Sequence, residues 1–434
     1  IKTQERVVNF FRNPEILGYQ YIGNLSEQRN KNIKEDRLRQ YLRLKGYADK
    51  LIDGAVTQLQ QASGDLSRGL YDANKTVYSL LKYGVKVSES PEKSPVTVEL
   101  IDEEHPLNND FAIAEEVTVV EQSEKRPDLV IYLNGVAVAV IELKRNGTPV
   151  SEGIRQNETN QKDTFIHRFF TTIQFCMAGN ESEGLRYGTI LTGEKFYMEW
   201  KDDGFKEHRE ERDPMDVRIS ETCAGIENRL LKQIYAMCDK ERFIDLIMNF
   251  VVFDKGRKKV CRYNQYFGVK RAEQRINNLR VELHNPNRDW RKPLGGILWH
   301  TQGSGKTLTM VWLAKWILTH WGELNARVLI VTDRDELDEQ IEKTFIGVDE
   351  NIVRTKSGKD LLNRLNVYDD SLICSLVHKF GRRGGEATEN DYDKYIEEMK
   401  ASLPADFEVK GNLVVFVDEC HRTQSGKLHT AMTT

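Results

Sequence analysis

The spacing of hydrophobic residues changes several times along the chain, and each change predicts a new structural element. Between about residues 35 and 84, apolar positions recur every three to four residues, which is typical of amphipathic helices. From residue 111 onwards, the apolar residues tend to recur at every second position, which predicts strands at 111–120, 129–133, 136–143 and 188–192. The polar stretch 153–170 is compatible with a helix. The first half therefore predicts an α/β domain built around a β-meander.

The second half alternates short apolar runs with amphipathic stretches. After a charge-dense segment at 199–216, a helical stretch is expected over 221–253. Strands are then expected at 297–299, 328–331, 372–376 and 413–417, and helices at 308–321 and 336–345. This alternation predicts a doubly wound parallel sheet. We therefore expect an α/β domain over 1–215, a helical connector over 216–259 and a parallel-sheet domain over 260–434.

Composition narrows the class of protein only a little. At 434 residues the chain exceeds what one hydrophobic core usually holds, and 30% charged residues are typical of a soluble protein. No apolar run reaches the roughly 18 residues of a membrane helix, and the start lacks a signal-peptide pattern. The six cysteines form no Cys-x-x-Cys pair, which argues against a zinc site and fits the cytoplasm. With a net charge of −4, any contact with nucleic acid must use local basic patches.

A glycine-rich loop, His-Thr-Gln-Gly-Ser-Gly-Lys-Thr at 300–307, lies between an expected strand and an expected helix. In this context the backbone N–H groups of Gly303-Ser304-Gly305 can approach phosphate oxygens, and the helix N-terminus adds partial positive charge. Lys306 is expected to reach the β- and γ-phosphates, and Thr307 to hold Mg²⁺. His300 stands where the general pattern has glycine. The alternative for such a loop alone is an ordinary flexible connection.

An apolar strand with two carboxylates at its end strengthens the prediction of an ATP site. The expected strand 413–417 delivers Asp418 and Glu419 to its C-terminal end, where ligands bind in open α/β sheets. Asp418 is expected to hold Mg²⁺, and Glu419 to polarise the attacking water. His421 is expected to couple the nucleotide to the rest of the domain. Together with the glycine-rich loop, this run predicts an ATPase.

A second group of charged residues ends an apolar run in the first half. The run 136–143 predicts a strand buried on both faces, yet Glu142 and Lys144 lie at its end and point to one side. Buried charges require a partner, and a metal ion supplies one. With Asp128 one hairpin upstream, we expect Asp128 and Glu142 to ligate Mg²⁺ and Lys144 to orient the attacking water. The alternative is an ordinary Glu–Lys pair at a strand end.

The turn between these two strands decides whether the carboxylates can meet. Asn134-Gly135 normally forms a two-residue turn. With that turn and an unbroken ladder, Asp128 and Glu142 lie on opposite faces of the hairpin. A three-residue turn, or a bulge with the same effect, brings Asp128 to the face of Glu142. The metal site therefore requires one of these two departures.

The motifs of the second half resemble those of superfamily 2 helicases and translocases. The glycine-rich loop and the Asp-Glu-Cys-His run at 418–421 stand in the family's order. Segments 331–340 and 375–380 resemble the motifs between them, the first of which contacts the DNA backbone in that family. Gln265 lies in a segment that resembles the family's adenine-sensing element, although an Arg/Gln pair before a helix is often only a solvated face. The resemblance implies a RecA-like fold.

The motifs of the first half resemble the PD-(D/E)xK nuclease of the R (restriction and motor) subunit of type I restriction-modification enzymes. The matching runs are Arg126-Pro127-Asp128 and Glu142-Leu143-Lys144, with Asn134-Gly135 between them. That family adds a Gln-x-x-x-Tyr motif on the following helix. Gln156 matches its glutamine and is expected to act at the nuclease site, whereas Asn160 replaces its tyrosine.

The combined resemblance covers nearly the whole chain and implies a function. It implies a subunit that couples ATP-driven translocation of duplex DNA to Mg²⁺-dependent cleavage, with ATP and Mg²⁺ as cofactors and methyltransferase (M) and specificity (S) subunits as partners. It also implies a second RecA-like domain that this chain lacks, so we expect residues 1–434 alone to bind ATP with negligible turnover. Two alternatives remain: a superfamily 2 helicase or remodelling ATPase whose nuclease-like hairpin is structural, and a non-catalytic assembly scaffold.

Overall fold

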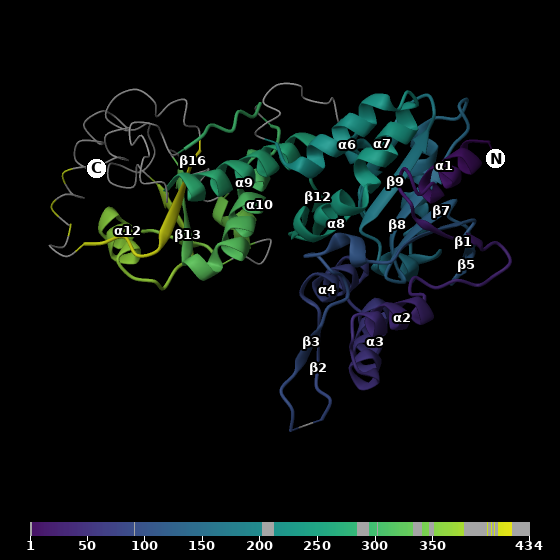
Figure 1. Cartoon of the computed structure of the whole chain (residues 1–434), viewed down its shortest axis with the longest axis horizontal. Coiled ribbons are helices and arrows are strands. Elements are labelled where there is room, and N and C mark those ends of the chain that lie inside the picture. Colours follow the sequence, from purple (N-terminus) through teal and green to yellow (C-terminus); the bar gives the residue numbers. More distant parts are fainter. Residues whose placement is uncertain are drawn as a thin grey trace. The chain divides into compact units, whose positions relative to one another are not determined.

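The computed structural model divides the chain into two compact units, residues 1–266 and 267–434. It describes residues 2–90, 92–201, 212–283, 295–301, 303–332, 341–346, 351–376 and 407–418, with single residues at 397, 401 and 403. Figure 1 labels many of the elements of both units, which are considered separately below. The helices of the expected connector belong to the first compact unit.

Helices at the start of the first unit confirm the periodicity seen over residues 35–84. They are α1 (Lys2–Arg12), α2 (Glu35–Leu44), α3 (Asp49–Gly64) and α4 (Leu70–Tyr83). The apolar residues of α3 that recur at helical spacing, including Ile52, Val56 and Leu59, are almost fully buried. Burial of such a face, rather than propensity alone, stabilises helices of this length. A small ribbon follows, formed by β2 (Val85–Val87) and β3 (Val96–Val98).

A six-stranded mixed sheet forms the centre of the first unit, in the order β1-β4-β7-β8-β9-β10. Its strands are β1 (Gln20–Asn24), β4 (Phe111–Glu115), β7 (Leu129–Leu133), β8 (Val136–Leu143), β9 (Phe175–Asn180) and β10 (Gly184–Gly188). β1 runs parallel to β4 and β8 parallel to β9, while the other neighbours are antiparallel. The expected β-meander is therefore wrong at β8, because α5 (Val150–Asn160) carries the chain across to a parallel strand.

Two further strand expectations need correction in the first unit. The strand expected at 111–120 divides into β4 and β5 (Val119–Val120), and β5 forms a separate ribbon with β6 (Glu124–Lys125). The strand expected at 188–192 is wrong, since β10 already ends at Gly188. Leu191 adopts a φ of +56°, which an extended strand does not allow, and the 3₁₀ helix η3 (Glu194–Phe196) follows.

Three capped helices and a hairpin complete the first unit. The helices are α6 (Pro214–Gly225), α7 (Arg229–Cys238) and α8 (Lys240–Asn249), and the hairpin is β11 (Val251–Asp254) with β12 (Arg257–Val260). Each helix starts at an Asp or Asn side chain that accepts a backbone N–H of its first turn: Asp213, Asn228 and Asp239. The helical expectation over 221–253 is thus confirmed up to residue 249.

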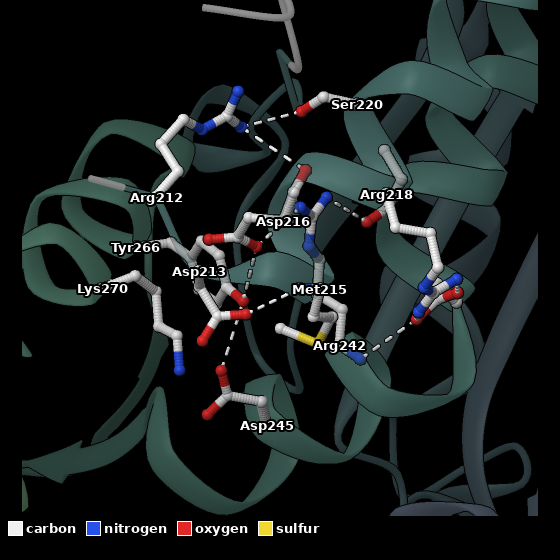
Figure 2. Close-up of polar contacts among 12 residues, drawn as sticks. Arg212, Asp213, Met215, Asp216, Arg218, Ser220, Arg242, Asp245, Tyr266 and Lys270 are labelled. Carbon is white, nitrogen blue, oxygen red and sulfur yellow. Dashed lines mark hydrogen bonds and ion pairs between the residues drawn. The ribbon is translucent and has the colours of Figure 1, made fainter. Parts of the chain in front are cut away.

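A buried ion pair holds α6 and α8 together. Arg242 is fully buried, and its Nη2 lies 2.8 Å from Asp216 Oδ1. The hydroxyl of Tyr266 lies 3.3 Å from the same Asp216 oxygen and 3.2 Å from Asp245 Oδ2 (Figure 2). The Arg242 guanidinium also lies over the ring of Trp200, 5.7 Å from its centroid. These contacts give the buried charge both an opposite charge and aromatic neighbours.

The hairpin after α8 is anchored by a lysine inside the unit. Lys258 is 5% exposed, and its Nζ donates to Asn74 Oδ1 at 2.8 Å and to Gln174 Oε1 at 2.5 Å. The Ile173 carbonyl accepts a third hydrogen bond at 3.2 Å. Burial lowers the pKa of Lys258 well below its usual range. The three neutral acceptors link β12 to α4 and to the segment before β9.

The second unit contains a four-stranded, all-parallel sheet in the order β14-β15-β13-β16. Its described elements are α10 (Lys306–His320), η5 (Gly322–Leu324), β13 (Ala326–Thr332), β14 (Val353–Arg354), α12 (Gly358–Leu365), β15 (Leu372–Leu376) and β16 (Asn412–Val417). α9 (Tyr263–Leu283) begins in the first unit and continues into the second. The expected parallel sheet is confirmed, and both units are mixed α/β structures.

One expected strand of the second unit is not formed. Residues 295–301 have no strand assignment, and the side chains of Ile297 and Trp299 are 63% and 84% exposed. Three apolar residues after a glycine pair can make few ladder bonds, so their hydrophobicity alone does not specify a strand. In the expected helix 336–345, residues 341–346 are helical and 336–340 lie outside the described residues. Among the helices that the structure describes, none has the length and apolar character needed to cross a bilayer.

Candidate functional site

The turn between β7 and β8 is the two-residue type. Asn134 and Gly135 both have positive φ, +51° and +82°, as a type I′ turn requires. Glycine is needed at 135 because a Cβ there would lie 2.6 Å from the carbonyl oxygen of Lys34. The Asn134 side chain fixes the turn, since its Nδ2 donates to the Leu100 carbonyl at 2.8 Å. The three-residue turn is therefore not formed.

A bulge in β8 corrects the register that this turn imposes. Tyr132 pairs with Ala137, but Ile131 already pairs with Ala139, which leaves Val138 as an extra residue in β8. The carbonyl of Val138 instead accepts the backbone N–H of Gln174 at 2.7 Å. Beyond the bulge the ladder is shifted by one residue. Either a three-residue turn or a bulge would bring Asp128 to the face of Glu142, and the structure forms the bulge.

The shifted register brings Asp128 and Glu142 to one face of the sheet. Leu129 pairs with Ile141, so the next positions along the two strands, Asp128 and Glu142, stand opposite each other. The backbone N–H of Leu143 donates to Asp128 Oδ2 at 2.6 Å. The Asp128 side chain is thereby held against the end of β8, next to Glu142.

Glu142 is fully buried, and neither of its carboxylate oxygens has a hydrogen-bond partner. Lys144 Nζ lies 4.0 Å from Glu142 Oε2, which is the limit for an ion pair. The same Nζ donates to Gln156 Oε1 at 2.6 Å. The structure therefore brings together all four nuclease residues of the first unit that the sequence predicts: Asp128, Glu142, Lys144 and Gln156.

Electrostatics at this cluster disfavour two free carboxylates. Burial raises the pKa of Glu142 well above its usual range, and the nearby charge of Asp128 raises it further, against the opposing charge of Lys144. Burial also raises the pKa of Asp128, although the Leu143 N–H and Lys144 counteract this shift. Glu142, whose oxygens are buried and unpartnered, and the neighbouring Asp128 are suited to a cation that would let both carboxyl groups ionise.

The donor set fits a hard divalent cation. Mg²⁺ binds oxygen ligands and typically uses one or two protein carboxylates, completing its shell with waters and substrate phosphates. Among the described residues, no group of three or more His, Cys, Asp or Glu side chains has the arrangement of a metal site. Asp128 and Glu142 would thus supply two ligands, and the remaining positions would be open to phosphate and water.

A glycine allows α5 to approach this cluster closely. A Cβ on Gly153 would lie 3.0 Å from Ala178 Cβ and 3.3 Å from Glu142 Cβ. One turn of helix later, Gln156 reaches Lys144. The packing of α5 on β8 and β9 therefore sets the position of Gln156.

Two further residues lie near the cluster: the sequence motif pointed to Asn160 but gave no reason to select Glu116. Asn160, where the resembling family has tyrosine, is 1% exposed, and neither polar atom of its side chain has a partner. Glu116 was missed: its charge raises the pKa values of both Asp128 and Glu142, and its N–H donates to the Asp128 carbonyl at 2.9 Å. Glu116 has a φ of +51°, a conformation enriched at functional sites. Its only sequence signal is an acidic pair at the end of an apolar strand.

The glycine-rich loop of the second unit opens α10 as expected. Gly303 and Gly305 have φ values of +74° and +90°, and Gly305 is the N-cap residue of the helix. Lys306 and Thr307 form its first turn. Ser304 is turned inward, with Oγ donating to the Thr301 carbonyl at 2.6 Å. The N-terminus of α10 thus lies at Lys306 and Thr307, and a helix N-terminus carries the partial positive charge that favours anions.

His300, in place of the usual glycine, packs behind this loop. Burial lowers its pKa, and the charge of Lys306 lowers it further. A Cβ on Gly268 would lie 3.0 Å from His300 Nε2, so a glycine in α9 leaves room for the imidazole. His300 Nδ1 lies 3.4 Å from Ser304 Oγ. A neutral imidazole here supports the loop without adding charge.

Asp418 follows β16 at the carboxyl edge of the parallel sheet. Its N–H donates to the Val331 carbonyl of β13 at 3.0 Å, and the residue is 9% exposed. Glu419 and His421 lie outside the described residues, as do the expected motif segments 333–340 and 377–380.

Gln265 is in the first compact unit and is 3% exposed. Its Oε1 accepts the backbone N–H of Arg262 at 2.8 Å, which caps the start of α9. The described contacts thus give this side chain a role in the local fold, and adenine recognition stays a prediction.

Comparisons with known proteins agree with both groups of motifs. A sequence model of the family "Type I restriction enzyme R protein N terminus" matches residues 2–196, and one of the family "SWI2/SNF2 ATPase" matches 264–434. The provisionally named type I restriction enzyme MjaIXP endonuclease subunit of Methanocaldococcus jannaschii is 28% identical over 373 residues, which are 82% of this chain and 33% of the relative. The type I restriction enzyme HindI endonuclease subunit of Haemophilus influenzae is 27% identical over 373 residues, with 82% of this chain and 32% of the relative covered.

A type I restriction enzyme endonuclease subunit of Staphylococcus aureus, SauCOLORF180P, is 25% identical over 344 residues, which are 78% of this chain and 32% of the relative. The chain spans about a third of the length of these curated relatives. The two family matches stand in the same order as the two groups of motifs. These matches support the N-terminal portion of a type I restriction enzyme R subunit as the counterpart of this chain.

Proposed function

We propose that this chain supplies the nuclease domain and the first RecA-like motor domain of a type I restriction enzyme, a type I site-specific deoxyribonuclease. In this proposal the first unit has a PD-(D/E)xK nuclease fold, and ATP-driven translocation of duplex DNA precedes cleavage. We retain the functional boundaries expected from the sequence: nuclease over 1–215, connector over 216–259 and motor over 260–434. The observation that carries the proposal is the bulge that places Asp128 opposite Glu142 beside Lys144.

In the nuclease domain, Asp128 and Glu142 would hold Mg²⁺. The bound ion would supply charge stabilisation for a phosphate and lower the pKa of a water. Lys144, fixed by Gln156 at 2.6 Å, would orient the attacking water through Nζ. Gln156 would act as a positioning residue for that ammonium group, and its amide would face the scissile phosphate. The Leu143 N–H would keep the Asp128 carboxylate in place during this chemistry.

In the motor domain, the first turn of α10 would bind the phosphates of ATP. Lys306 would contact the β- and γ-phosphates, with the backbone of Gly303-Ser304-Gly305 around them. Thr307 and Asp418 would share Mg²⁺ with the nucleotide. Glu419 would polarise the water, with His421 and Gln265 contacting the nucleotide from other segments. The match to SWI2/SNF2 ATPases over residues 264–434 supports this assignment.

The partners we propose are double-stranded DNA and the M and S subunits of a type I complex. The names of the relatives support participation in a restriction enzyme. Target recognition and methyl transfer would lie on those partner subunits, because no motif of this chain resembles either activity.

The proposal is tested by reconstituting the full-length parent protein with its M and S partners. Cleavage of duplex DNA and ATP hydrolysis are measured for the wild type, Glu142→Ala and Lys306→Ala. We expect Glu142→Ala to lose cleavage and keep ATP hydrolysis, because its site lies in a different unit from the nucleotide loop. Lys306→Ala should lose both translocation and hydrolysis.

Two results would contradict the proposal. Full cleavage by Glu142→Ala would favour the alternative of a superfamily 2 motor with a structural nuclease-like domain. Absence of ATP binding in the wild type, so that Lys306→Ala changes nothing, would favour a non-catalytic scaffold.

A further inference from the structure

A tyrosine ring lies beside the strand residue that pairs with Glu142. Tyr197 follows η3, and its ring packs against Val150, Ile154 and Ala178. Ala178 on β9 pairs with Glu142 on β8 in the parallel ladder, so their side chains share the face of the sheet that α5 covers. Tyr197 and Glu142 therefore both lie next to Ala178, on the face of the sheet that α5 covers.

The hydroxyl of Tyr197 is buried and has no hydrogen-bond partner. Several oxygen acceptors in this region share that condition: both carboxylate oxygens of Glu142, Oε1 of Glu158 and Oδ1 of Asn157. Glu142 and Asn157 are 0% exposed. Unpartnered buried polar groups are rare in native proteins, and several together indicate a shared partner such as an ordered water. The Tyr197 hydroxyl can donate a hydrogen bond, whereas the other unpartnered oxygens of this group can accept one.

The charges around this hydroxyl keep it protonated. Burial raises the pKa of Tyr197, and the charges of Cys176, Glu158 and Glu142 raise it further. Both carboxyl groups are thus within electrostatic range of the phenol. A protonated phenol can donate to a carboxylate but cannot act as its base at neutral pH.

We propose that Tyr197 is a positioning residue of the nuclease site: its hydroxyl donates to an ordered water, and that water donates in turn to the Glu142 carboxylate and to Asn157 Oδ1. This inference rests on the proposed nuclease function and adds a residue to it. The hydrogen bond fixes one oxygen of Glu142 from behind and leaves the other directed towards the metal position. Hydrogen bonds to metal-ligating carboxylates typically change metal affinity or activity by roughly 10–100-fold.

The test is Tyr197→Phe in the full-length subunit, because this change removes one oxygen and keeps the ring. Mg²⁺ binding is measured by calorimetry without nucleotide, and cleavage by the reconstituted complex is titrated with Mg²⁺. We expect about tenfold weaker Mg²⁺ binding, a matching shift in the Mg²⁺ dependence of cleavage and unchanged ATP hydrolysis. Cleavage should recover at saturating Mg²⁺, which a general loss of structure would not permit.

Tyr187→Phe is the matched control. Tyr187 is a buried tyrosine on β10, and its hydroxyl donates to the Cys261 carbonyl at 2.8 Å. It pairs with Met177, one residue before Ala178, and therefore lies on the opposite face of the sheet from Glu142. We expect this variant to lose stability but to keep the wild-type Mg²⁺ dependence.

Wild-type Mg²⁺ affinity in Tyr197→Phe, or an equal loss in Tyr187→Phe, would overturn the inference. Failure of the underlying nuclease proposal looks different. In that case Glu142→Ala itself would leave Mg²⁺ binding and cleavage unchanged.

Discussion

Asp128 Oδ2 accepts a 2.6 Å hydrogen bond from the backbone N–H of Leu143, across the hairpin and one residue beyond Glu142. The bond ties a side chain of the first strand to the main chain of the second, at the point where the ladder pairs end. Any change that slides β7 along β8 therefore breaks this bond and separates the two carboxylates together. The distance between the two carboxylates and the strand register are therefore coupled in this hairpin.

Replacing Glu142 with glutamine is expected to remove cleavage but to stabilise the metal-free protein at neutral pH. The pKa of Glu142 is raised in the folded state, so the folded protein holds a proton more tightly than the unfolded chain. Below the pKa of this acid in the unfolded chain, about 4.3, Glu142 is protonated in both states and does not lower the stability of the fold. Above that pH the unfolded chain loses the proton first, so the folded state becomes less stable until the pH reaches the raised pKa of the folded state. Thermal unfolding without metal, from pH 4 to pH 8, should show the wild type losing stability relative to Glu142→Gln.

Added Mg²⁺ should make the wild type more stable to thermal unfolding than Glu142→Gln. A ligand that binds only the folded state raises its stability with concentration, and the glutamine variant lacks the charged ligand. Equal Mg²⁺ stabilisation of both proteins would argue against a metal at Glu142.

Gly153→Ala is expected to impair cleavage while sparing ATP hydrolysis. The new methyl group would lie 3.0 Å from Ala178 Cβ and 3.3 Å from Glu142 Cβ, so α5 must shift by a few tenths of an ångström. That shift moves Gln156 away from Lys144, and a loss of roughly tenfold in the cleavage rate is reasonable for misplaced catalytic groups. Gly225→Ala on α6, where a Cβ meets nothing within 4 Å, is the control. Equal rates for the two variants would show that the closeness of α5 is unimportant.

Lys306→Ala is expected to abolish ATP binding without changing the nuclease metal site. Fluorescent-nucleotide binding should be lost, because the ammonium group opposite the phosphates is removed. The Mg²⁺ stabilisation attributed to Asp128 and Glu142 should remain, since these residues belong to the other compact unit. Loss of both signals would mean that the two sites are not independent.

Asp216→Ala is expected to destabilise the first unit by about 3–5 kcal/mol, because it leaves the fully buried Arg242 guanidinium without its carboxylate. Denaturant unfolding measures this change. Arg43→Ala is the control: the Arg43–Asp49 pair has side chains 58% and 77% exposed, and its removal should cost about 1 kcal/mol or less. A similar small effect at Asp216 would show that the buried pair contributes little.

Local patterns in the sequence predicted most elements around the site. The bounds of β7 and β8 agree with the expected strands 129–133 and 136–143, because both are uninterrupted apolar runs that end at turn or charged residues. The grouping of Asp128, Glu142 and Lys144 was predicted from the charged residues around the hairpin, and Gln156 was added by the resemblance to R-subunit nucleases. The position of the bulge could not be derived in the same way. Val138 turns its carbonyl to the N–H of Gln174, a residue far along the chain that no local pattern connects to it.

The remaining differences also have tertiary causes. β9 was missed because residues 175–180 are buried on both faces and show no alternation. The prediction that Gln265 contacts the nucleotide remains open, and the structure adds a local contact that the sequence did not show: its Oε1 accepts the backbone N–H of Arg262 at the start of α9. A sequence motif indicates which residue type could fill a role. Only the folded chain shows whether the local backbone also forms a hydrogen bond with that side chain.

The lysine at the centre of the β11–β12 hairpin has a consequence for biosynthesis. Lys258 is the donor for Asn74 and Gln174, which lie inside the region that matches the R protein N terminus, residues 2–196. A nascent chain that has emerged only to residue 196 still lacks that donor, so the side-chain oxygens of Asn74 and Gln174 would lack the ammonium group that they accept from in the folded chain. The first unit therefore does not complete these interior hydrogen bonds when residues 2–196 alone have left the ribosome. It must wait for the hairpin about sixty residues later, just before α9 starts towards the motor.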